Sequence, residues 1–395
     1  MTDFTATRRA FHLPRGVTYL DGNSLGPMPV AAAERVARMM ADEWSEMLIG
    51  GWNGAGWYAQ PRRVGDRIAR LIGAGPGQVV MGDTLSIKVF QALSAALRLR
   101  PGRRVILSDS GNFPSDLYVA QGLARAVGAE LRVVAPEAVE AAIAPDLAVL
   151  MLTEVDYRTG RRHDMAALTA RAQDAGALTV WDLAHSAGAV DVDLLGADAD
   201  FAVGCTYKYL NGGPGAPAFI WTHPRHADAA QPILQGWMGH DAPFAFDLDY
   251  RPAAGVERMR VGTPPVIALS ALDAALDVWD GVSVADLRAR SIVLSEAFVA
   301  GVEARCPDVT LNSPRDPARR GSQVGFGHPE GFAVMQALIA AGVVGDFRAP
   351  NVLRFGFAPL YNDLDDVARA VETLARILRD RSWDHGHFQR KAAVT

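Results

Sequence analysis

Asp182 and Lys208 are the residues whose types and positions indicate chemistry most directly. Asp182 ends the apolar run Leu-Thr-Val-Trp-Asp, and Lys208 follows a second apolar run, just before the turn Asn-Gly-Gly-Pro-Gly at 211–215. The chain has only three lysines, and arginine carries its other positive charges. A lysine can lose its proton and form a Schiff base, whereas an arginine cannot. An acid and a lysine at neighbouring strand ends are what pyridoxal phosphate (PLP) needs, because the lysine holds the aldehyde and the acid pairs with the ring nitrogen.

These residues also have plainer interpretations. Asp182 could cap a helix or a turn after its strand, since aspartate is common at such positions. Lys208 could be a surface lysine, but that interpretation does not explain why arginine is not used there. His185 comes three residues after Asp182 and is either a cofactor contact or a structural histidine. The neighbouring acid and lysine favour the contact.

Short apolar runs alternate with amphipathic stretches through the middle of the chain. The alternation predicts strands at 104–108, 131–135, 148–154, 178–182, 200–205 and 217–222, with helices at 86–99, 115–127 and 164–176. This order indicates an α/β fold with a mostly parallel sheet that is covered on both faces. Because ligands bind at the carboxyl ends of such strands, we expect Thr153, Asp182 and Lys208 to share a site.

The pattern changes after Pro264-Pro265. Helices are predicted at 266–279, 284–305, 331–341 and 364–381, with short strands at 322–327 and 351–357. We therefore expect three parts: a large PLP-binding α/β domain at 46–263, a smaller α+β domain at 264–395, and an N-terminal segment at 1–45 that packs with the smaller domain.

Two predicted helices begin with residues suited to a phosphate or a flat ring. Thr84-Leu85-Ser86 stands where the helix at 86–99 begins, and helix N-termini attract anions, although these residues could simply cap the helix. Phe113 comes before a proline ahead of the next helix. Its ring could stack on a cofactor or act as a hydrophobic staple.

Arg354 lies inside the apolar run Asn-Val-Leu-Arg-Phe-Gly-Phe, where an arginine must be paired. Its partner is either a substrate carboxylate or an internal acid. Ser24 completes a G-x-S-x-G pattern, but the 21 residues before it leave no room for the sheet of a serine hydrolase. We therefore expect a turn at 21–26, with Ser24 available to touch the substrate.

Composition narrows the classes of function. The chain has 395 residues, of which 49% are hydrophobic and 21% charged, and its net charge of -5 argues against a nucleic-acid or anionic-membrane partner. We find no apolar run long enough to span a bilayer and no signal-peptide pattern. Cys205 and Cys306 fit neither a disulfide framework nor a zinc site, so we expect a cytoplasmic protein without a metal.

The chain resembles the kynureninase family, whose members are fold-type-I PLP enzymes related in fold to the aspartate aminotransferases. The resemblance covers nearly the whole chain. Its motifs are Tyr-Leu-Asp-Gly-Asn-Ser-Leu-Gly (19–26), Trp-Asn-Gly-Ala-Gly-Trp (52–57), Asn-Phe-Pro-Ser-Asp-Leu-Tyr (112–118), Trp-Asp-Leu-Ala-His-Ser-Ala-Gly-Ala-Val (181–190), Cys-Thr-Tyr-Lys-Tyr-Leu-Asn-Gly-Gly-Pro-Gly (205–215), Gly-Trp-Met-Gly-His (236–240) and Leu-Arg-Phe-Gly-Phe-Ala-Pro-Leu-Tyr (353–361). It implies a fold-type-I PLP-dependent transferase-like architecture: a mostly parallel seven-stranded central sheet flanked by helices, plus a smaller α+β domain.

The resemblance also implies roles for individual residues. Lys208 would be the Schiff-base lysine, Asp182 the partner of the pyridine nitrogen, and Tyr207 a phosphate ligand and a candidate proton shuttle. The further cofactor contacts that it implies are Leu85, Ser86, Phe113, Asp116, Thr153, His185, Trp237 and Thr263. Trp237 and Thr263 would reach the phosphate of a neighbouring subunit, which implies a homodimer with shared active sites. Arg354 would bind the substrate α-carboxylate, with Ser24 and Trp52 near the aryl ketone.

The activity that the resemblance implies is hydrolysis of the Cβ–Cγ bond of L-kynurenine or 3-hydroxy-L-kynurenine. The products would be L-alanine and anthranilate or 3-hydroxyanthranilate, in tryptophan catabolism. The motifs leave the choice between the two substrates open. A cysteine desulfurase of the same fold is the alternative, but it needs a reactive cysteine on a mobile loop. Neither Cys205 nor Cys306 has Gly/Ser-rich surroundings.

Overall fold

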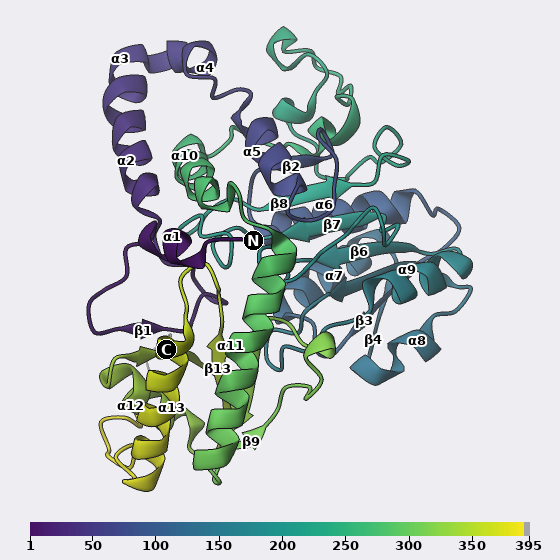
Figure 1. The fold of residues 1–395 in the computed structure, drawn as a ribbon. Helices are drawn as coiled ribbons and strands as arrows, with labels where there is room; N and C mark the ends of the chain where they lie inside the picture. Colours follow the sequence, from purple (N-terminus) through teal and green to yellow (C-terminus); the bar gives the residue numbers. More distant parts are fainter. Residues whose placement is uncertain (391–395) are drawn as a thin grey trace.

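The computed structural model describes residues 1–390, and its centre is a seven-stranded sheet with helices on both faces (Figure 1). The strands, in the order β2-β8-β7-β6-β5-β3-β4, are β2 (Val79–Met81), β8 (Phe219–Thr222), β7 (Phe201–Gly204), β6 (Leu178–Asp182), β5 (Leu147–Thr153), β3 (Val105–Asp109) and β4 (Glu130–Val134). Strands β7, β6, β5, β3 and β4 are parallel, whereas β8 is antiparallel to both its neighbours. The prediction of a mostly parallel seven-stranded sheet is confirmed.

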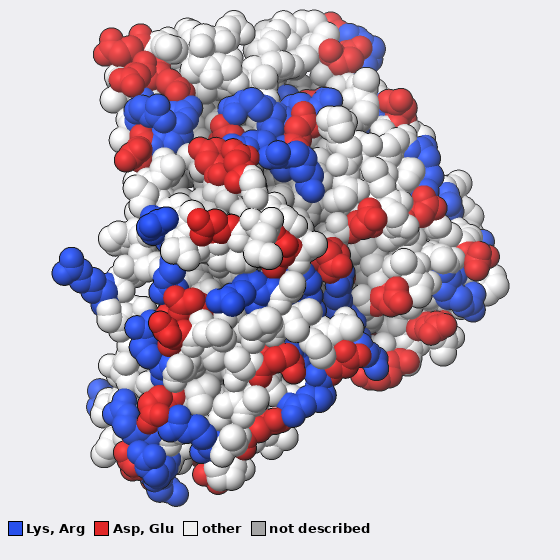
Figure 2. Space-filling model, viewed as in Figure 1, with Lys and Arg blue, Asp and Glu red and all other residues white. Residues whose placement is uncertain are grey.

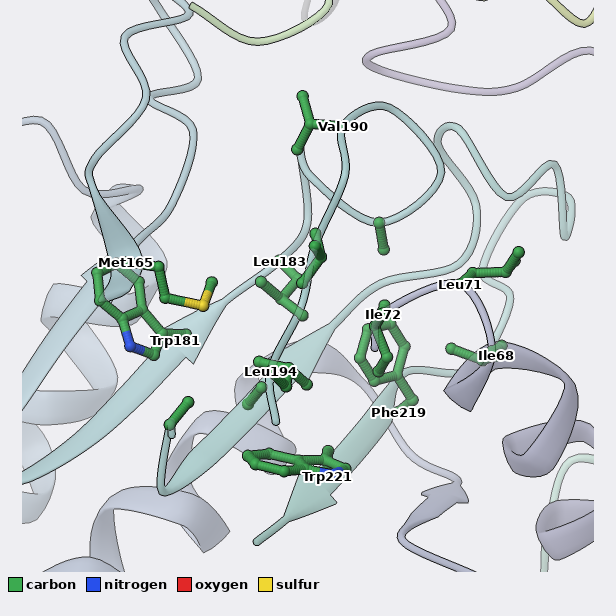
Figure 3. Packing of buried hydrophobic residues seen from close by; sticks show 14 of the residues in the cluster. Ile68, Leu71, Ile72, Met165, Trp181, Leu183, Val190, Leu194, Phe219 and Trp221 are labelled. Atoms are coloured by element: carbon green, nitrogen blue, oxygen red, sulfur yellow. The ribbon is translucent and has the colours of Figure 1, made fainter. Parts of the chain in front are cut away.

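Alternate residues of each strand point to opposite faces of this sheet. On β6, Val180 packs under α6 (Leu85–Arg98) and α7 (Pro114–Val127), while Trp181 packs on the opposite face with α9 (Met165–Asp174). Figure 3 shows this second face, where Trp181 lies beside Met165 and the β8 residues Phe219 and Trp221 line the same layer. Helices α5 (Gln60–Ala69) and α10 (Val266–Ala275) contribute to the same cluster. Because both faces are covered, the strands are apolar almost throughout.

A second, smaller sheet has the order β12-β13-β10-β9 and is antiparallel. Its strands are β12 (Asp346–Arg348), β13 (Val352–Gly356), β10 (Gln323–Gly327) and β9 (Thr310–Leu311). Its helices are α11 (Val284–Arg305), α12 (Gly331–Ala340) and α13 (Leu364–Arg379), which share a separate apolar cluster with the sheet. The predicted helix at 266–279 is shorter than expected: α10 ends at Ala275 and a 3-10 turn follows at Leu276–Trp279.

The N-terminal segment contacts both parts of the molecule. Helix α1 (Phe4–Arg9) is joined to α13 by the ion pair Arg8–Asp366, and β1 (Thr18–Tyr19) pairs in parallel with β11 (Val343–Val344). Helix α2 (Val30–Arg38), by contrast, contacts α10. The division at residues 45 and 263 stays a prediction.

An arm leads from α2 to the tip of the molecule (upper left in Figure 1). It consists of α2, a π-helical turn (Met39–Trp44), α3 (Ser45–Met47) and α4 (Gly51–Gly54). Large apolar side chains on this arm are exposed, and Ile49 has 81% of its surface accessible.

Acidic and basic side chains lie close together over the face shown in Figure 2. This mixture agrees with the small net charge of -5. None of the helices within residues 1–390 is long and apolar enough to span a membrane.

Candidate active site

Lys208 and Asp182 meet at the carboxyl edge of the large sheet, as the sequence predicts. Strand β6 ends at Asp182, and the parallel strand β7 ends at Gly204, so that Lys208 lies in the turn that follows. This turn is held from outside by the N-terminal segment, since the amide of Gly26 donates to the carbonyl of Tyr207. A Cβ on Gly26 would lie 2.3 Å from the carbonyl oxygen of Lys208, so only glycine allows this close approach.

The amino group of Lys208 forms a hydrogen bond with His185. The distance from Nζ to Nε2 is 2.9 Å, and His185 Nδ1 lies 2.8 Å from Oε1 of Gln323 on β10. Burial strongly lowers the pKa of His185, and the positive charge of Lys208 lowers it further. The imidazole is therefore neutral, and its two nitrogens have different roles.

Two buried carboxylates face each other beneath Lys208. Burial raises the pKa of Asp182 against the attraction of Lys208, and burial raises that of Asp116 well above its usual range, with the charge of Asp182 adding to the effect. Asp182 also accepts from the Ala184 amide at 2.8 Å and lies 3.4 Å from the hydroxyl of Thr153. Oxygen Oδ2 of Asp116 has no hydrogen-bond partner. The pair is thus prepared to accept a hydrogen bond from a cationic N–H group.

The first turns of α6 and α7 converge near this pair. Ser86 of α6 and Ser115 of α7 lie 3.0 Å apart through their hydroxyl groups, and Leu85 is the first residue of α6. Thr84 makes no capping hydrogen bond, so the amides of this turn are open to an external acceptor. Phe113 precedes α7, and its ring packs edge-on against that of Tyr157, with 5.2 Å between the ring centroids.

Arg354 is engaged by an internal acid. Asp346 on the adjacent strand β12 binds it at two points, with Nε 2.7 Å from Oδ1 and Nη2 in contact with Oδ2. Ser24 accepts from Arg354 Nη2 at 2.9 Å, and Nη1 of Arg354 donates to the carbonyl of Tyr157. Of the two partners considered from the sequence, the internal acid is therefore present. Binding of a substrate carboxylate by Arg354 stays a prediction.

A second arginine joins this cluster. Arg348 Nη2 lies 2.7 Å from Asp346 Oδ2 and 3.1 Å from Ser24 Oγ, and a third of its side chain is exposed. Burial, reinforced by the charge of Asp346, raises the pKa of the nearby Asp21 to about 8, so at neutral pH Asp21 is mainly protonated. Two arginines thus share one carboxylate, and the cluster retains a positive charge that suits a substrate carboxylate.

Trp52, Trp237 and Thr263 lie elsewhere in the chain. Trp52 stands on α4 at the tip of the arm and meets Trp57 edge-on, while Trp237 meets Phe244 edge-on at 5.6 Å. Thr263 lines a small cavity with Asp83 beside the beginning of α6. A single chain therefore gathers the lysine, acid and arginine groups and leaves Trp52 and Trp237 outside this group, whereas Thr263 lies close to the beginning of α6.

Three residues of the site were missed by the sequence analysis. Gln323, Asp346 and Arg348 all lie on the small sheet, on strands β10 and β12. Their partners come from distant parts of the chain, and no local motif surrounds them. The only available signal was the predicted strand at 322–327, inside which a glutamine is unexpected.

The two cysteines do not suit a thiol mechanism. Burial raises the pKa of Cys205, and burial raises that of Cys306 to about 11. Both side chains are almost completely buried. The thiolate, which is the reactive form, is therefore disfavoured at both positions.

Comparison with solved structures defines the class of fold. The fold is similar to that of a cysteine desulfurase from Thermococcus onnurineus NA1, with a TM-score of 0.80 at 19% identity over 96% of this chain and 99% of that one. It is equally similar to C-DES with glycine covalently linked to its PLP cofactor, with a TM-score of 0.80 at 17% identity over 95% and 99% of the two chains. The chain therefore has the fold of the fold-type-I PLP-dependent, transferase-like class.

Sequence comparison then identifies the family. The chain is 50% identical to kynureninase of Pseudomonas fluorescens and 52% identical to kynureninase of Burkholderia pseudomallei (strain 1106a), each over 98% of this chain and 95% of the relative. Residues 287–374 match the model of the kynureninase C-terminal domain. The chain belongs to the kynureninase family.

The residues present fit the PLP cofactor of this family. Oδ2 of the buried Asp116 has no hydrogen-bond partner, and burial raises the pKa of Asp182. A pyridinium N–H at this place would donate a hydrogen bond and supply a compensating positive charge. The charge of Lys208 acts on both carboxyl groups, and the first turns of α6 and α7, which meet through Ser86 and Ser115, offer donors to a phosphate.

Proposed function

We propose that this protein is a PLP-dependent hydrolase that cleaves the Cβ–Cγ bond of L-kynurenine or its 3-hydroxy form, releasing L-alanine and an anthranilate. The observation that supports it most is the pairing of Lys208 and the Asp116–Asp182 carboxylates with a separate cationic cluster around Arg354. Such a site holds a cofactor at one end and an amino-acid carboxylate at the other.

The roles of the residues follow from the geometry. Lys208 would hold the cofactor aldehyde and, once displaced by the substrate amine, would move the α-proton. Asp182, with Asp116 beside it, would keep the ring nitrogen protonated. PLP, when bound in this way, supplies an electron sink next to the Cα–Cβ bond. Tyr207, whose pKa is raised mainly by burial, stays protonated and is suited to donate a proton.

The substrate carboxylate would bind at the Arg354–Arg348 cluster. Nη2 of Arg354 and Nη2 of Arg348 both donate to the hydroxyl oxygen of Ser24, so the two guanidinium groups face the same region. The carbonyl of Tyr157 accepts from both Arg354 and Gln323, so the carboxylate cluster and the Lys208 cluster share one anchor. Leu85, Ser86, Phe113 and Thr153 would surround the cofactor, as the resemblance implies.

We also propose that the active protein is a homodimer. The arm carries Leu48 and Ile49 exposed at its tip, and the loop at 244–248 exposes Phe246 and Leu248, the latter with its whole side chain accessible. Pairing of two copies would cover these surfaces, and it would bring Trp52, Trp237 and Thr263 toward the site of the partner. Both cysteines are free, which supports a cytoplasmic location.

The direct test adds L-kynurenine and 3-hydroxy-L-kynurenine separately to the PLP-loaded protein and follows the fluorescence of the product for kcat/KM. Release of anthranilate or 3-hydroxyanthranilate with equimolar alanine is expected. Sulfide release from L-cysteine, without cleavage of either kynurenine, would instead support a desulfurase.

A further inference from the structure

We propose that Gln323 is a positioning residue that fixes His185 as the Nδ1–H tautomer and thereby reserves the lone pair of Nε2 for the amino group of Lys208. The kinetic consequences of this inference rest on the proposed role of Lys208. The tautomer itself is a property of the protein and can be measured without substrate.

The orientation of the Gln323 amide follows from its backbone partners. One terminal atom of the amide lies 2.9 Å from the carbonyl oxygens of both Asp156 and Tyr157. Carbonyl oxygens only accept hydrogen bonds, so this atom must be the NH2 nitrogen, and both its protons are used. The amide oxygen therefore faces His185, at 2.8 Å from Nδ1.

The orientation of the amide decides the protonation of the imidazole. An amide oxygen cannot donate, so Nδ1 of His185 must carry the proton. In the neutral ring Nε2 is then an acceptor, and Lys208 Nζ, 2.9 Å away, must be the donor. The cationic groups that face the ring favour its neutral form: burial lowers the pKa of His185, and Lys208, Arg354 and Arg348 lower it further.

This contact joins the two sheets. Gln323 is the first residue of β10 and pairs with Gly356 on the neighbouring strand β13. Arg354 lies on β13 two residues before Gly356. The carbonyl of Tyr157 accepts from Gln323 and from Arg354. The chain segment that positions the carboxylate-binding cluster thus also orients the histidine next to Lys208. When the amino group of Lys208 is not bonded to a cofactor, its hydrogen bond to Nε2 of His185 fixes the direction of the amine.

Two variants separate this role from simple support of the fold. Gln323→Leu removes the acceptor at Nδ1, so that only the contact of Nε2 with Lys208 still favours one tautomer of His185. Gln323→Glu is nearly isosteric but cannot donate to the two carbonyls, and its negative charge favours imidazolium. Ser313→Ala is the matched control, because Ser313 ties the same two segments through the amide of Gly325 and the carbonyl of Thr159 without touching His185.

The first readout is the nitrogen NMR spectrum of 15N-histidine-labelled full-length protein without cofactor, with His185 assigned by its loss in His185→Asn. We expect a protonated Nδ1 and an unprotonated Nε2 in the parent protein and in Ser313→Ala. In Lys208→Ala, where no ammonium faces Nε2, we expect the same pattern, and in Lys208→Ala combined with Gln323→Leu we expect a tautomer mixture. The parent pattern in that double variant would overturn the proposal.

The second readout is the pH profile of the PLP-loaded enzyme. Gln323→Leu should lower kcat about 10- to 100-fold, the effect known for losing a partner that orients a metal-bound histidine, with KM within about twofold of the parent. In Gln323→Glu the acid limb of kcat/KM should move up by about one pH unit, because an added carboxylate raises the pKa of His185.

An unmoved acid limb in Gln323→Glu, an unchanged kcat in Gln323→Leu, or an equal shift in Ser313→Ala would each overturn the proposal. If Gln323→Leu fails to fold, Gln323→Glu alone decides. A protein that cleaves no kynurenine but shows the expected NMR pattern would contradict the proposed function and leave the tautomer assignment standing.

Discussion

Arg354 and Asp346 form an ion pair across neighbouring strands, and each side chain has only 1% of its surface exposed. The two residues are direct partners in the β12–β13 ladder, so the backbone register alone brings the guanidinium against the carboxylate. Ser24, from a segment more than three hundred residues earlier, donates to the same carboxylate at 2.5 Å. The arginine proposed to bind substrate is thus fixed in place before any substrate arrives.

Replacing Asp346 with asparagine should destabilise the protein by about 3 kcal/mol, because it leaves a buried arginine without its counter-charge. Although burial acts in the opposite direction, the charge of Arg354 lowers the pKa of Asp346 in the folded protein. Its contribution is therefore present above the pKa of the unfolded chain and is lost as the pH falls through the folded pKa. Urea unfolding should show the difference at pH 7 and a smaller one in acid. Asp146→Asn, which breaks an exposed pair with Arg132, should change stability little.

Asp21→Asn should flatten the pH dependence of stability. Burial and the charge of Asp346 raise the pKa of Asp21 to about 8, so the folded protein retains a proton that the unfolded chain loses near pH 4. Stability contributed by this proton is lost between these two values as the pH rises. Relative to the parent, the variant should gain at least about 1.4 kcal/mol between pH 5 and pH 8, the equivalent of one pKa unit. The same difference in unfolding free energy between the variant and the parent at pH 5 and at pH 8 would contradict the raised pKa of Asp21.

Lys208→Arg keeps a positive charge but cannot bind the aldehyde. We expect kcat to fall at least about a thousandfold and the visible absorption band of the bound cofactor to disappear. Borohydride reduction of the parent protein followed by peptide mass spectrometry should place the cofactor at position 208. A label at Lys88, which is buried in contact with Asp83 and Gln91, would contradict the assignment.

Ile49→Glu should weaken the proposed dimer, because the contact between two copies would bury this side chain and a buried carboxylate needs a partner. Sedimentation velocity should show a shift toward monomer, together with a loss of activity that rises on dilution. Val293→Glu, at an exposed valine on α11, provides the control and should leave the association state unchanged. A parent protein that is monomeric yet fully active would exclude a shared site.

The central sheet could be predicted because its strands are continuous apolar runs. Buried on both faces, the strands at 148–154 and 178–182 have few alternatives to a parallel sheet, and the residues at their ends mark the site. Strand β2, with three residues, and strands β1 and β11, with two each, are too short to show a period. These short strands form because the rest of the fold places their pairing partners next to them.

The site could be predicted where one residue type implies a chemistry. A rare lysine and a strand-end aspartate do so, but Gln323 and Asp346 do not. A glutamine in a strand has no chemical signature until it is known that the carbonyls of Asp156 and Tyr157 lie on one side and His185 on the other. The role of Arg354 stayed open for the same reason, since its partner Asp346 lies on a strand of three residues.

The segment from Thr18 to Gly26 runs between the two sheets: it pairs with β11, supplies Ser24 to the arginine cluster and supports the turn of Lys208 through Gly26. Any shortened version of this protein must therefore retain the chain from Thr18 onward. A protease cut inside this segment would remove the hydroxyl of Ser24 from the arginine cluster and the support of Gly26 from the Lys208 turn in a single event, even if both hydrophobic cores remained folded.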